Sequence, residues 1–143
     1  MRARRTGAVP IAAVLGAAAV GLAACSGIAL VDAKTYVDGI RVETPAFGAL
    51  PEGTYRGAYA IAVPAGSVAM AREFAVAVDL AEDAGSRRIA AIRVEKPDSY
   101  PDEAFMPTMI SRVVDFQSLA VDSVSGATFS SKAFLKAVED ALD

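Results

Sequence analysis

Alternation of apolar and polar residues predicts three β-strands ahead of the C-terminal third of the chain. On the first strand, every second residue lies on one face, namely Tyr55, Gly57, Tyr59, Ile61 and Val63. The second strand, Glu73–Leu80, has the clearest alternation, and its apolar face holds Phe74, Val76, Val78 and Leu80. A period of two residues is typical of a strand that buries one of its faces.

The third predicted strand, Ile89–Lys96, forms a hairpin with the second. Its apolar face is expected to hold three residues opposite Arg93 and Glu95, namely Ala90, Ile92 and Val94. Turn-forming residues over Glu82–Arg87 separate the two strands. Strands joined by such a loop are most simply antiparallel neighbours.

Apolar residues three and four positions apart predict two helices after the strands. The first runs from about Pro107 to Gln117, because proline is tolerated in a first helical turn. Its apolar stripe, expected to fill the core, consists of Met106, Met109, Ile110, Val113 and Val114. The second helix, Lys132–Leu142, presents Phe134, Ala137, Val138 and Ala141 on one face. This order predicts an α+β fold, a small antiparallel sheet with helices packed on one side.

The first 24 residues predict an export signal. Three arginines precede the apolar, alanine-rich run Ala8–Ala24, which is short for a membrane span. The run closes on Leu-Ala-Ala followed by Cys25, which resembles the lipobox of bacterial lipoproteins. This resemblance implies a lipid on Cys25 as the first mature residue, held at the extracytoplasmic face of a membrane. An ordinary cleaved signal with a chance cysteine and an uncleaved anchor helix are the alternatives.

The mature chain is acidic and lacks the residues of several common sites. The full chain has 14 Lys and Arg against 17 Asp and Glu, and removal of the three signal arginines brings the net charge from −3 to about −6. This charge disfavours nucleic acid and anionic lipid as partners. Because histidine is absent and Cys25 is the only cysteine, His/Cys metal sites, Ser-His-Asp triads and disulfides are excluded. The carboxylates show no spacing that suggests a metal site.

The mature chain divides into a connecting segment and one domain. Residues 25–49 are expected to form a lipid-anchored tether and an extended arm, with weak alternation over Tyr36–Val42 that suits a short strand or extended chain. The domain is predicted over residues 50–143, which is an ordinary domain size.

The stretch 122–131, Asp-Ser-Val-Ser-Gly-Ala-Thr-Phe-Ser-Ser, combines hydroxyls with very small residues ahead of the last helix. Gly126 accepts backbone angles that other residues avoid, and with Ala127 it lets an anion approach the first amides of a helix. Ser125 and Thr128 offer hydroxyls beside that position. The pattern predicts a phosphate cradle with a hydroxyl placed for covalent attachment. An ordinary helix start, capped by Ser or Thr, fits the same residues.

The segment Val121–Ser131 resembles the flavinylation motif of the FMN-binding domain family, roughly Asp-x-x-Ser/Thr-Gly-Ala-Thr-x-Ser/Thr. The domain's opening, Glu52–Gly57, resembles the family's Asp-Gly-x-Tyr-x-Gly, with Glu52 in place of Asp. The family includes subunits of sodium-pumping quinone reductases and of ferredoxin-linked electron-transport complexes. The resemblance implies FMN joined through its phosphate to Thr128. The residues implied around this cofactor are Ser125, Gly126, Ala127 and Ser130.

The resemblance also implies a separate FAD-dependent, Mg²⁺-using FMN transferase that reads Asp122. An alkyl hydroxyl is a weak nucleophile without a base, and the chain has no histidine to act as one. Once Thr128 is esterified, Ser130 or Ser131 is expected to cap the last helix. Phe129, at a variable position of the motif, is expected in the core rather than against the flavin.

Three functions from different classes are compatible with this sequence. The expected function is that of an electron carrier, which exchanges electrons with membrane redox partners. A substrate-specific enzyme is not expected. A flavin-dependent reductase is an alternative, but the chain has no room for the catalytic module of larger family members. A cofactor-free binding or assembly lipoprotein is the other alternative. The carrier is favoured because the motif has both Asp122 and the hydroxyl of Thr128.

Overall fold

The computed structural model describes residues 33–61, 72–96 and 102–143. The predictions for the export signal, Cys25 and Val63 lie outside these residues. The elements in chain order are the helix α1 (Ala33–Asp38), the 3₁₀ helix η2 (Phe47–Ala49), the strands β1 (Gly53–Ile61), β2 (Arg72–Asp83) and β3 (Ser86–Lys96), and the helices α2 (Phe105–Phe116) and α3 (Thr128–Leu142). None of these helices has the length and apolar character needed to cross a membrane.

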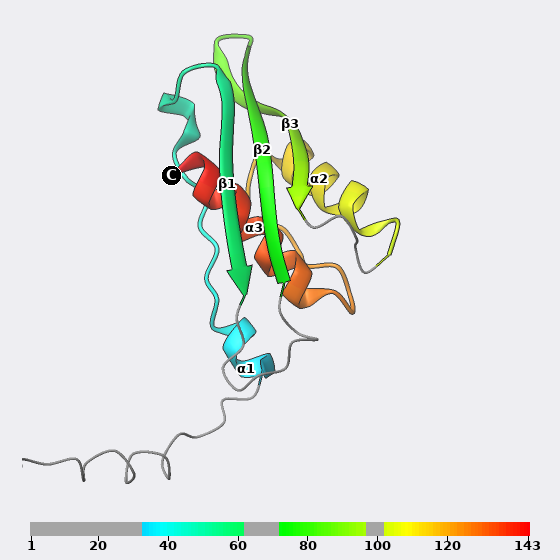
Figure 1. The fold of residues 1–143 in the computed structure, drawn as a ribbon. Helices are drawn as coiled ribbons and strands as arrows, with labels where there is room; N and C mark the ends of the chain where they lie inside the picture. The colour runs from blue at the N-terminus through cyan, green and yellow to red at the C-terminus, as the bar shows by residue number, and fades with distance from the viewer. Residues whose placement is uncertain (1–32, 62–71, 97–101) are drawn as a thin grey trace, which may run out of the picture.

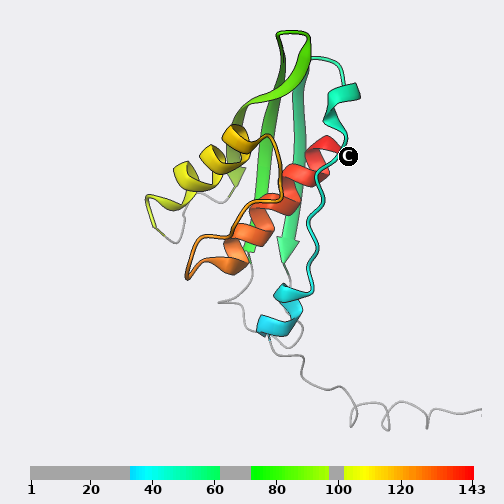
Figure 2. The ribbon, with the colours of Figure 1, turned by 180° about the vertical axis from the view of Figure 1, so that it is seen from behind.

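The three strands form one antiparallel sheet in the order β1-β2-β3 (Figure 1). Both long helices lie against the same face of this sheet, α3 across β1 and β2, and α2 beside β3 (Figures 1 and 2). The α+β prediction, with an antiparallel sheet and helices on one side, is confirmed.

Three phenylalanines form the centre of the core between the two layers. The ring centroid of Phe74 on β2 lies 6.3 Å from that of Phe105 on α2 and 6.0 Å from that of Phe134 on α3. All three side chains are fully buried. The predicted core positions Met106 and Met109 are also buried, so these methionines are core residues.

Close contact between α3 and β1 depends on Gly57. A Cβ atom at this position would lie 2.3 Å from the backbone nitrogen of Ala141 and 2.4 Å from the carbonyl oxygen of Ala137. Both are backbone atoms of α3, so neither can move as a side chain would. Gly57, the last residue of the opening segment Glu52–Gly57, therefore sets how closely α3, the helix that carries Thr128, approaches the sheet.

The predicted face of β3 is wrong at Ala90. Ile89 and Ile92 are buried, whereas Ala90 is exposed. The pairing with β2 shifts at this point, because Leu80 pairs with Ile89 while Asp79 pairs with Ala91. Ala90 is the extra residue of a β-bulge. The bulge moves the residues before it to the opposite face of the sheet from the one that simple alternation predicts.

The hairpin between β2 and β3 is tighter than expected. Both strands extend into the predicted loop Glu82–Arg87, and only Ala84 and Gly85 connect them, with φ angles of 50° and 80°. Two consecutive residues with positive φ are typical of a type I′ turn, whose twist suits an antiparallel hairpin. Beside this turn, Glu52 accepts a hydrogen bond from the backbone N–H of Glu82 (2.7 Å) and pairs with Arg87 (3.2 Å).

The two long helices also begin earlier than predicted. Helix α2 starts at Phe105 and ends before Gln117, which adopts the left-handed conformation (φ 51°, ψ 39°). The side-chain amide of Gln117 accepts a hydrogen bond from the N–H of Ile89 (2.7 Å) and donates one to its carbonyl (3.0 Å). This pair joins the end of α2 to β3. Helix α3 starts at Thr128 rather than Lys132.

The prediction of a strand or extended chain over Tyr36–Val42 is wrong in its first part, because Ala33–Asp38 is helical. Val37 is 1% exposed, and Tyr36 and Ile40 pack against the core. Tyr36 and Ile40 lie four positions apart and Val37 and Ile40 three, and these spacings bring side chains to one side of a helical turn. An arm follows α1 and leads to η2.

This arm lies against the second half of the domain. The carbonyl of Ile40 accepts a hydrogen bond from Lys132 (2.9 Å), and the N–H of Glu43 donates to Glu139 (3.1 Å). The hydroxyl of Thr44 accepts one from the N–H of Leu119 (2.9 Å). Residues 40–44 are therefore held by α3 and by the loop that precedes it.

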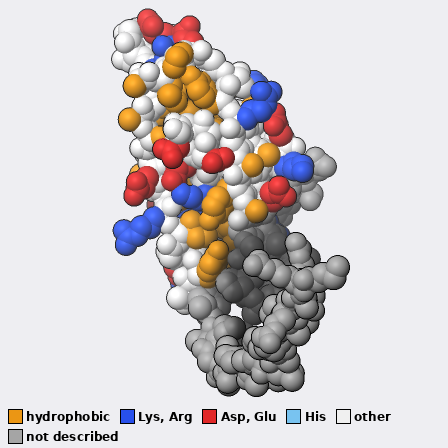
Figure 3. Space-filling model, turned by 60° about the vertical axis from the view of Figure 1, so that its left-hand side comes forward, with side chains coloured by type: hydrophobic (Ala, Val, Ile, Leu, Met, Phe, Trp, Pro, Cys, Tyr) orange, Lys and Arg blue, Asp and Glu red, His pale blue; other side chains and the backbone are white. Residues whose placement is uncertain are grey.

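The outer face of the sheet carries charged and polar side chains among alanines. Asp79 accepts hydrogen bonds from Thr54 (2.6 Å) and from Arg93 on the neighbouring strands. The Thr54 hydroxyl first, and then Arg93, lower the pKa of Asp79 from its ordinary value. On the side that carries β1 and the arm, hydrophobic groups form separate patches with acidic and basic groups between them (Figure 3).

Candidate functional site

The predicted motif forms the loop between α2 and α3 together with the first turn of α3. Gly126 has a φ of 76°, and a Cβ built there would meet nothing within 4 Å. This glycine is needed for its backbone conformation, since L-residues rarely adopt such an angle. Without a side chain, the space beside the turn stays open.

Buried Ser131 holds this loop in place. Its hydroxyl accepts a hydrogen bond from the N–H of Val124 (3.0 Å) and donates one to the carbonyl of Ala127 (2.9 Å). The N–H of Ala127 in turn donates to the carbonyl of Val124 (3.0 Å). The side chain of Ser131 is fully buried. It therefore fixes the turn that brings Gly126 and Thr128 to the start of α3.

No serine caps α3, so the expectation that Ser130 or Ser131 does so is wrong. Ala127 occupies the N-cap position, and no side chain makes a capping hydrogen bond there. The first N–H groups of an α-helix have no partner within the helix. They give this end of α3 a partial positive charge that favours a phosphate.

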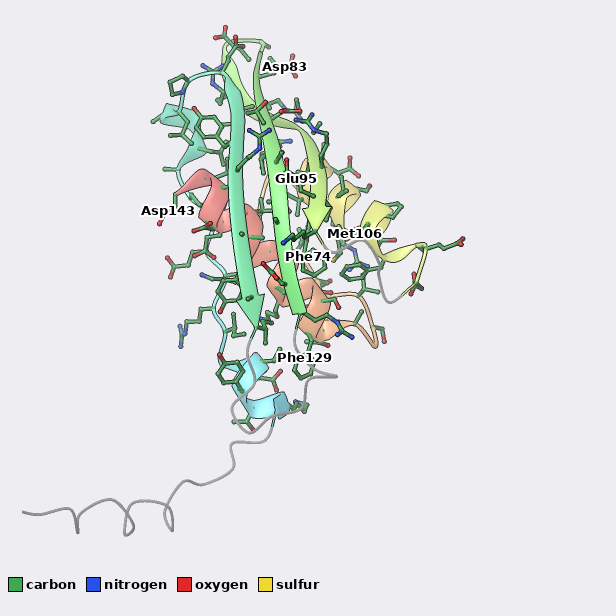
Figure 4. The ribbon with its side chains drawn as sticks, in the orientation of Figure 1. Phe74, Asp83, Glu95, Met106, Phe129 and Asp143 are labelled. Atoms are coloured by element: carbon green, nitrogen blue, oxygen red, sulfur yellow. The ribbon has the colours of Figure 1, made fainter. Side chains whose placement is uncertain are left out.

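Thr128, the first residue of α3, lines a pocket of about 330 Å³. The pocket lies between α1 and the first turn of α3, and its lining consists of Lys34, Val37, Asp38, Gly126, Thr128 and Phe129. Figure 4 shows Phe129 at the N-terminal end of α3, near α1. Thr128 itself is half-buried, so its hydroxyl is close to the surface without being fully solvated.

The other predicted site residues lie around this pocket without lining it. Ser125 is exposed and Ala127 is buried. Ser130 is 2% exposed, and its hydroxyl accepts a hydrogen bond from Arg72 (3.3 Å). Residues two apart on a helix point in nearly opposite directions, so Ser130 faces β2 when Thr128 faces the pocket. Among the predicted cofactor residues, the structure thus brings Gly126 and Thr128 together at the pocket.

Asp122, the predicted transferase recognition residue, is exposed on the same loop. Its carbonyl accepts a hydrogen bond from Arg112 on α2 (2.5 Å). A second pocket, of about 260 Å³, lies here and is lined by Arg112, Phe116, Ala120, Val121 and Asp122. Phe116 is 73% exposed, which is unusual for a large apolar side chain.

Three residues of α1 line the Thr128 pocket and were missed by sequence reasoning. Val37 is 1% exposed and contributes almost no accessible surface, and Lys34 pairs with Asp38 at 2.5 Å. The available signal was the helical spacing of Tyr36, Val37 and Ile40. Phe129 both packs against the core and lines the pocket, so its predicted core position is only half of its role.

Comparison with protein families identifies the fold around this pocket. A family model described as the FMN-binding domain matches residues 26–143. The chain belongs to the FMN-binding domain family. The predicted membership of this family is thereby confirmed, and FMN is the cofactor of this domain. A search of curated proteins gave no match, and a search of solved structures gave none either.

The residues at the pocket fit FMN. The start of α3 suits the phosphate because of its partial positive charge and the missing side chain at Gly126. The half-buried Phe129 provides apolar surface for a flat ring. A volume of about 330 Å³ is at the low end for ligand pockets, which run from roughly 300 to 1,000 Å³. We therefore expect the pocket to enclose part of the cofactor and leave part of it at the surface.

Proposed function

We propose that this chain is an extracytoplasmic, lipid-anchored flavoprotein that carries FMN covalently on Thr128 and acts as an electron-transfer carrier. The observation that carries the proposal is the position of the motif threonine. Thr128 is the first residue of α3, follows Gly126 in its left-handed conformation, and lines the pocket against α1. A hydroxyl in this position is within reach of a modifying enzyme, and a phosphate attached to it lies beside the helix N-terminus.

Attachment requires an FMN transferase with FAD as donor. The transfer breaks the pyrophosphate bond of FAD and forms a phosphoester on the Thr128 Oγ1. AMP leaves, and the hydroxyl proton is released. The chain has no histidine that would activate the hydroxyl, which favours a separate enzyme over self-modification. Exposed Asp122 is the residue proposed for recognition by that enzyme.

The remaining residues of the pocket favour a carrier over a reductase. When bound, FMN supplies reversible electron transfer, and the protein supplies its attachment and surroundings. A substrate-reducing enzyme needs a proton donor with a pKa near its working pH. Of the described residues lining the pocket, only Lys34 and Asp38 are charged, and they pair with each other. Because the pocket encloses only part of the FMN, an edge of the flavin ring stays accessible to transient redox partners, which bind through small interfaces.

The carrier proposal predicts low selectivity among electron acceptors. Reduced, flavinylated protein should transfer electrons to ferric chelates and soluble quinones at comparable rates, because neither needs a shaped substrate pocket. Stopped-flow absorbance of the flavin measures each rate. Saturation with one small organic acceptor, together with almost no reaction with the others, would instead support a substrate-specific reductase.

The lipid anchor is proposed on Cys25, the last residue of the lipobox-like sequence. Cys25→Ser should move the protein from the detergent phase to the aqueous phase in detergent partitioning, because the acyl chains are lost. The fold should not change, since α1 begins eight residues later. Continued partitioning of the variant into detergent would favour an uncleaved anchor helix over a lipid.

A further inference from the structure

We propose that the FMN transferase docks on the exposed end of α2, where Phe116 is the apolar anchor and Asp122 is the charged contact. The inference rests on the proposed attachment of FMN to Thr128 by a separate enzyme, and it names the surface that this enzyme binds. Arg112 has a positioning role in this surface, because it holds the backbone of Asp122.

The exposure of Phe116, the last residue of α2, sets it apart. Its side chain is 73% exposed, and it is the one large hydrophobic side chain that is exposed in the described part of the chain. Phe105, at the other end of the same helix, is fully buried. Aromatic side chains are enriched among the residues that contribute most to the affinity of protein–protein interfaces, where they fill pockets of the partner. A single exposed apolar residue does not define an interface, so the surroundings of Phe116 decide.

Phe116 shares a pocket with the residue proposed for recognition. The pocket of about 260 Å³ is lined by Arg112, Phe116, Ala120, Val121 and Asp122. Arg112 lies four residues before Phe116, so both side chains are on the same side of α2. The loop that follows α2 brings Asp122 to this pocket. An apolar anchor and a carboxylate are therefore presented together.

Arg112 contacts the backbone of Asp122 and leaves the carboxylate available to a partner. A guanidinium nitrogen of Arg112 donates a hydrogen bond to the carbonyl oxygen of Asp122 (2.5 Å). Within the described residues, the Asp122 carboxylate forms no ion pair, and the residue is exposed. This surface is complementary to a transferase face that offers a cationic side chain next to an apolar pocket.

The distance from this surface to the attachment residue fits a single interface. Asp122 precedes Thr128 by six residues, which span at most about 22 Å. Phe116 lies about 6 Å along α2 from Arg112, which contacts Asp122. A standard interface covers about 800 Å² on each partner, which corresponds to a disc roughly 30 Å across. One bound transferase can therefore cover Phe116 and Asp122 while it reaches the Thr128 hydroxyl.

The other side of Thr128 has to receive the cofactor. The pocket that Thr128 lines is formed with α1, and α1 and α2 lie on different sides of the start of α3 (Figures 1 and 2). A transferase bound over α1 would cover the space that FMN enters. A redox partner, by contrast, has to approach the flavin on the α1 side. The end of α2 therefore suits the transferase better than it suits a redox partner.

Transferase kinetics on the apo form of the full mature chain test the docking site. Phe116→Ser should raise the KM of the transferase for the chain at least about tenfold and leave kcat nearly unchanged, because Phe116 contributes binding without touching the reacting atoms. Mass spectrometry follows the reaction at saturating FAD and Mg²⁺. Phe116→Leu, which keeps an apolar side chain, should recover most of the loss. An unchanged KM for Phe116→Ser would overturn the proposal.

Ser111→Ala is the matched control on the same helix. Ser111 is exposed, lies on another side of α2 from Phe116 and does not line the pocket, so its replacement should leave KM unchanged. An increase of KM equal to that of Phe116→Ser would mean that α2 as a whole, and not the Phe116 anchor, determines binding.

A double-mutant cycle tests the positioning role of Arg112. Arg112→Gln should raise KM several-fold in the wild-type background, but by less than about twofold when Asp122→Ala is already present, because its effect passes through Asp122. Arg112→Lys, which keeps a donor for the Asp122 carbonyl, should retain part of the function. Equal effects of Arg112→Gln in the two backgrounds would contradict the positioning role.

Failure of the proposed attachment gives a different result from failure of the docking site. A wild-type chain that gains no FMN mass from the transferase would contradict the attachment alone. Docking is then measured as the affinity of the apo chain for immobilised transferase, which Phe116→Ser should weaken at least about tenfold. Equal affinity of the two chains, or no binding of wild type, would overturn the docking site. A wild-type dimer that Phe116→Ser dissociates, with unchanged transferase kinetics, would assign this surface to a second copy instead.

Discussion

Thr128→Val should yield a folded protein without covalently bound FMN. Valine has nearly the shape of threonine and lacks only the hydroxyl that would form the phosphoester. Because Thr128 is half-buried and makes no capping hydrogen bond, the fold should lose little stability. The protein is produced together with the transferase, denatured in acid, and weighed by mass spectrometry, while circular dichroism checks the fold.

The matched control is Ser125, a second hydroxyl of the motif. Ser125 is exposed three residues earlier and does not line the pocket, so Ser125→Ala should keep the adduct. Thr128→Ser, which retains a hydroxyl, should keep at least part of it. An adduct that survives Thr128→Val and disappears with Ser125→Ala would move the attachment to Ser125.

Gly57→Ala should destabilise the domain by about 3 kcal/mol, at the upper end of the usual cost of overpacking. The added Cβ would lie 2.3 Å and 2.4 Å from backbone atoms of α3, so the whole helix has to shift. A domain of this size has a total stability of about 5–15 kcal/mol. Urea unfolding followed by circular dichroism gives the change from the midpoint and the m-value.

Gly48→Ala is the control for this substitution. Gly48 is exposed in η2, and a Cβ there would meet nothing within 4 Å. Its replacement should change the free energy of unfolding by no more than about 0.5 kcal/mol, as is usual at a surface position. Equal effects of the two substitutions would mean that the contact between β1 and α3 is not as close as described.

The sheet was predictable because one buried face imposes a period of two on the sequence. Phe74, Val76, Val78 and Leu80 are all buried, as their alternation predicted. The bulge at Ala90 was not predictable, because an extra residue in one strand leaves no mark in the composition of that strand. Simple alternation, continued across the bulge, therefore assigns the residues before it to the wrong face of the sheet.

The start of α3 shows tertiary contacts overriding local preference. Residues 128–131 contain Thr and two Ser, which are weak helix formers, so the helix was predicted to begin at Lys132. In the structure Ser130 and Ser131 are buried, and their hydroxyls bond to Arg72 and to the motif loop. These contacts stabilise a helical turn that the sequence alone disfavours.

The candidate site was predictable on the side formed by the motif. Gly126 and Thr128 lie close together in the sequence, and the structure places both at one pocket. The other wall comes from α1, about ninety residues earlier in the chain. No local pattern reports a contact over such a separation, so Val37 was read as part of an arm rather than of a site.

The most direct test of covalent attachment is the mass of the mature wild-type protein after acid denaturation, from cells with and without the FMN transferase. The account predicts an added mass of one FMN less one water, present only with the transferase. After proteolysis, this mass and the yellow colour should remain on the peptide that contains Thr128. Flavin that separates from the denatured chain, or an adduct on a peptide without Thr128, would contradict it.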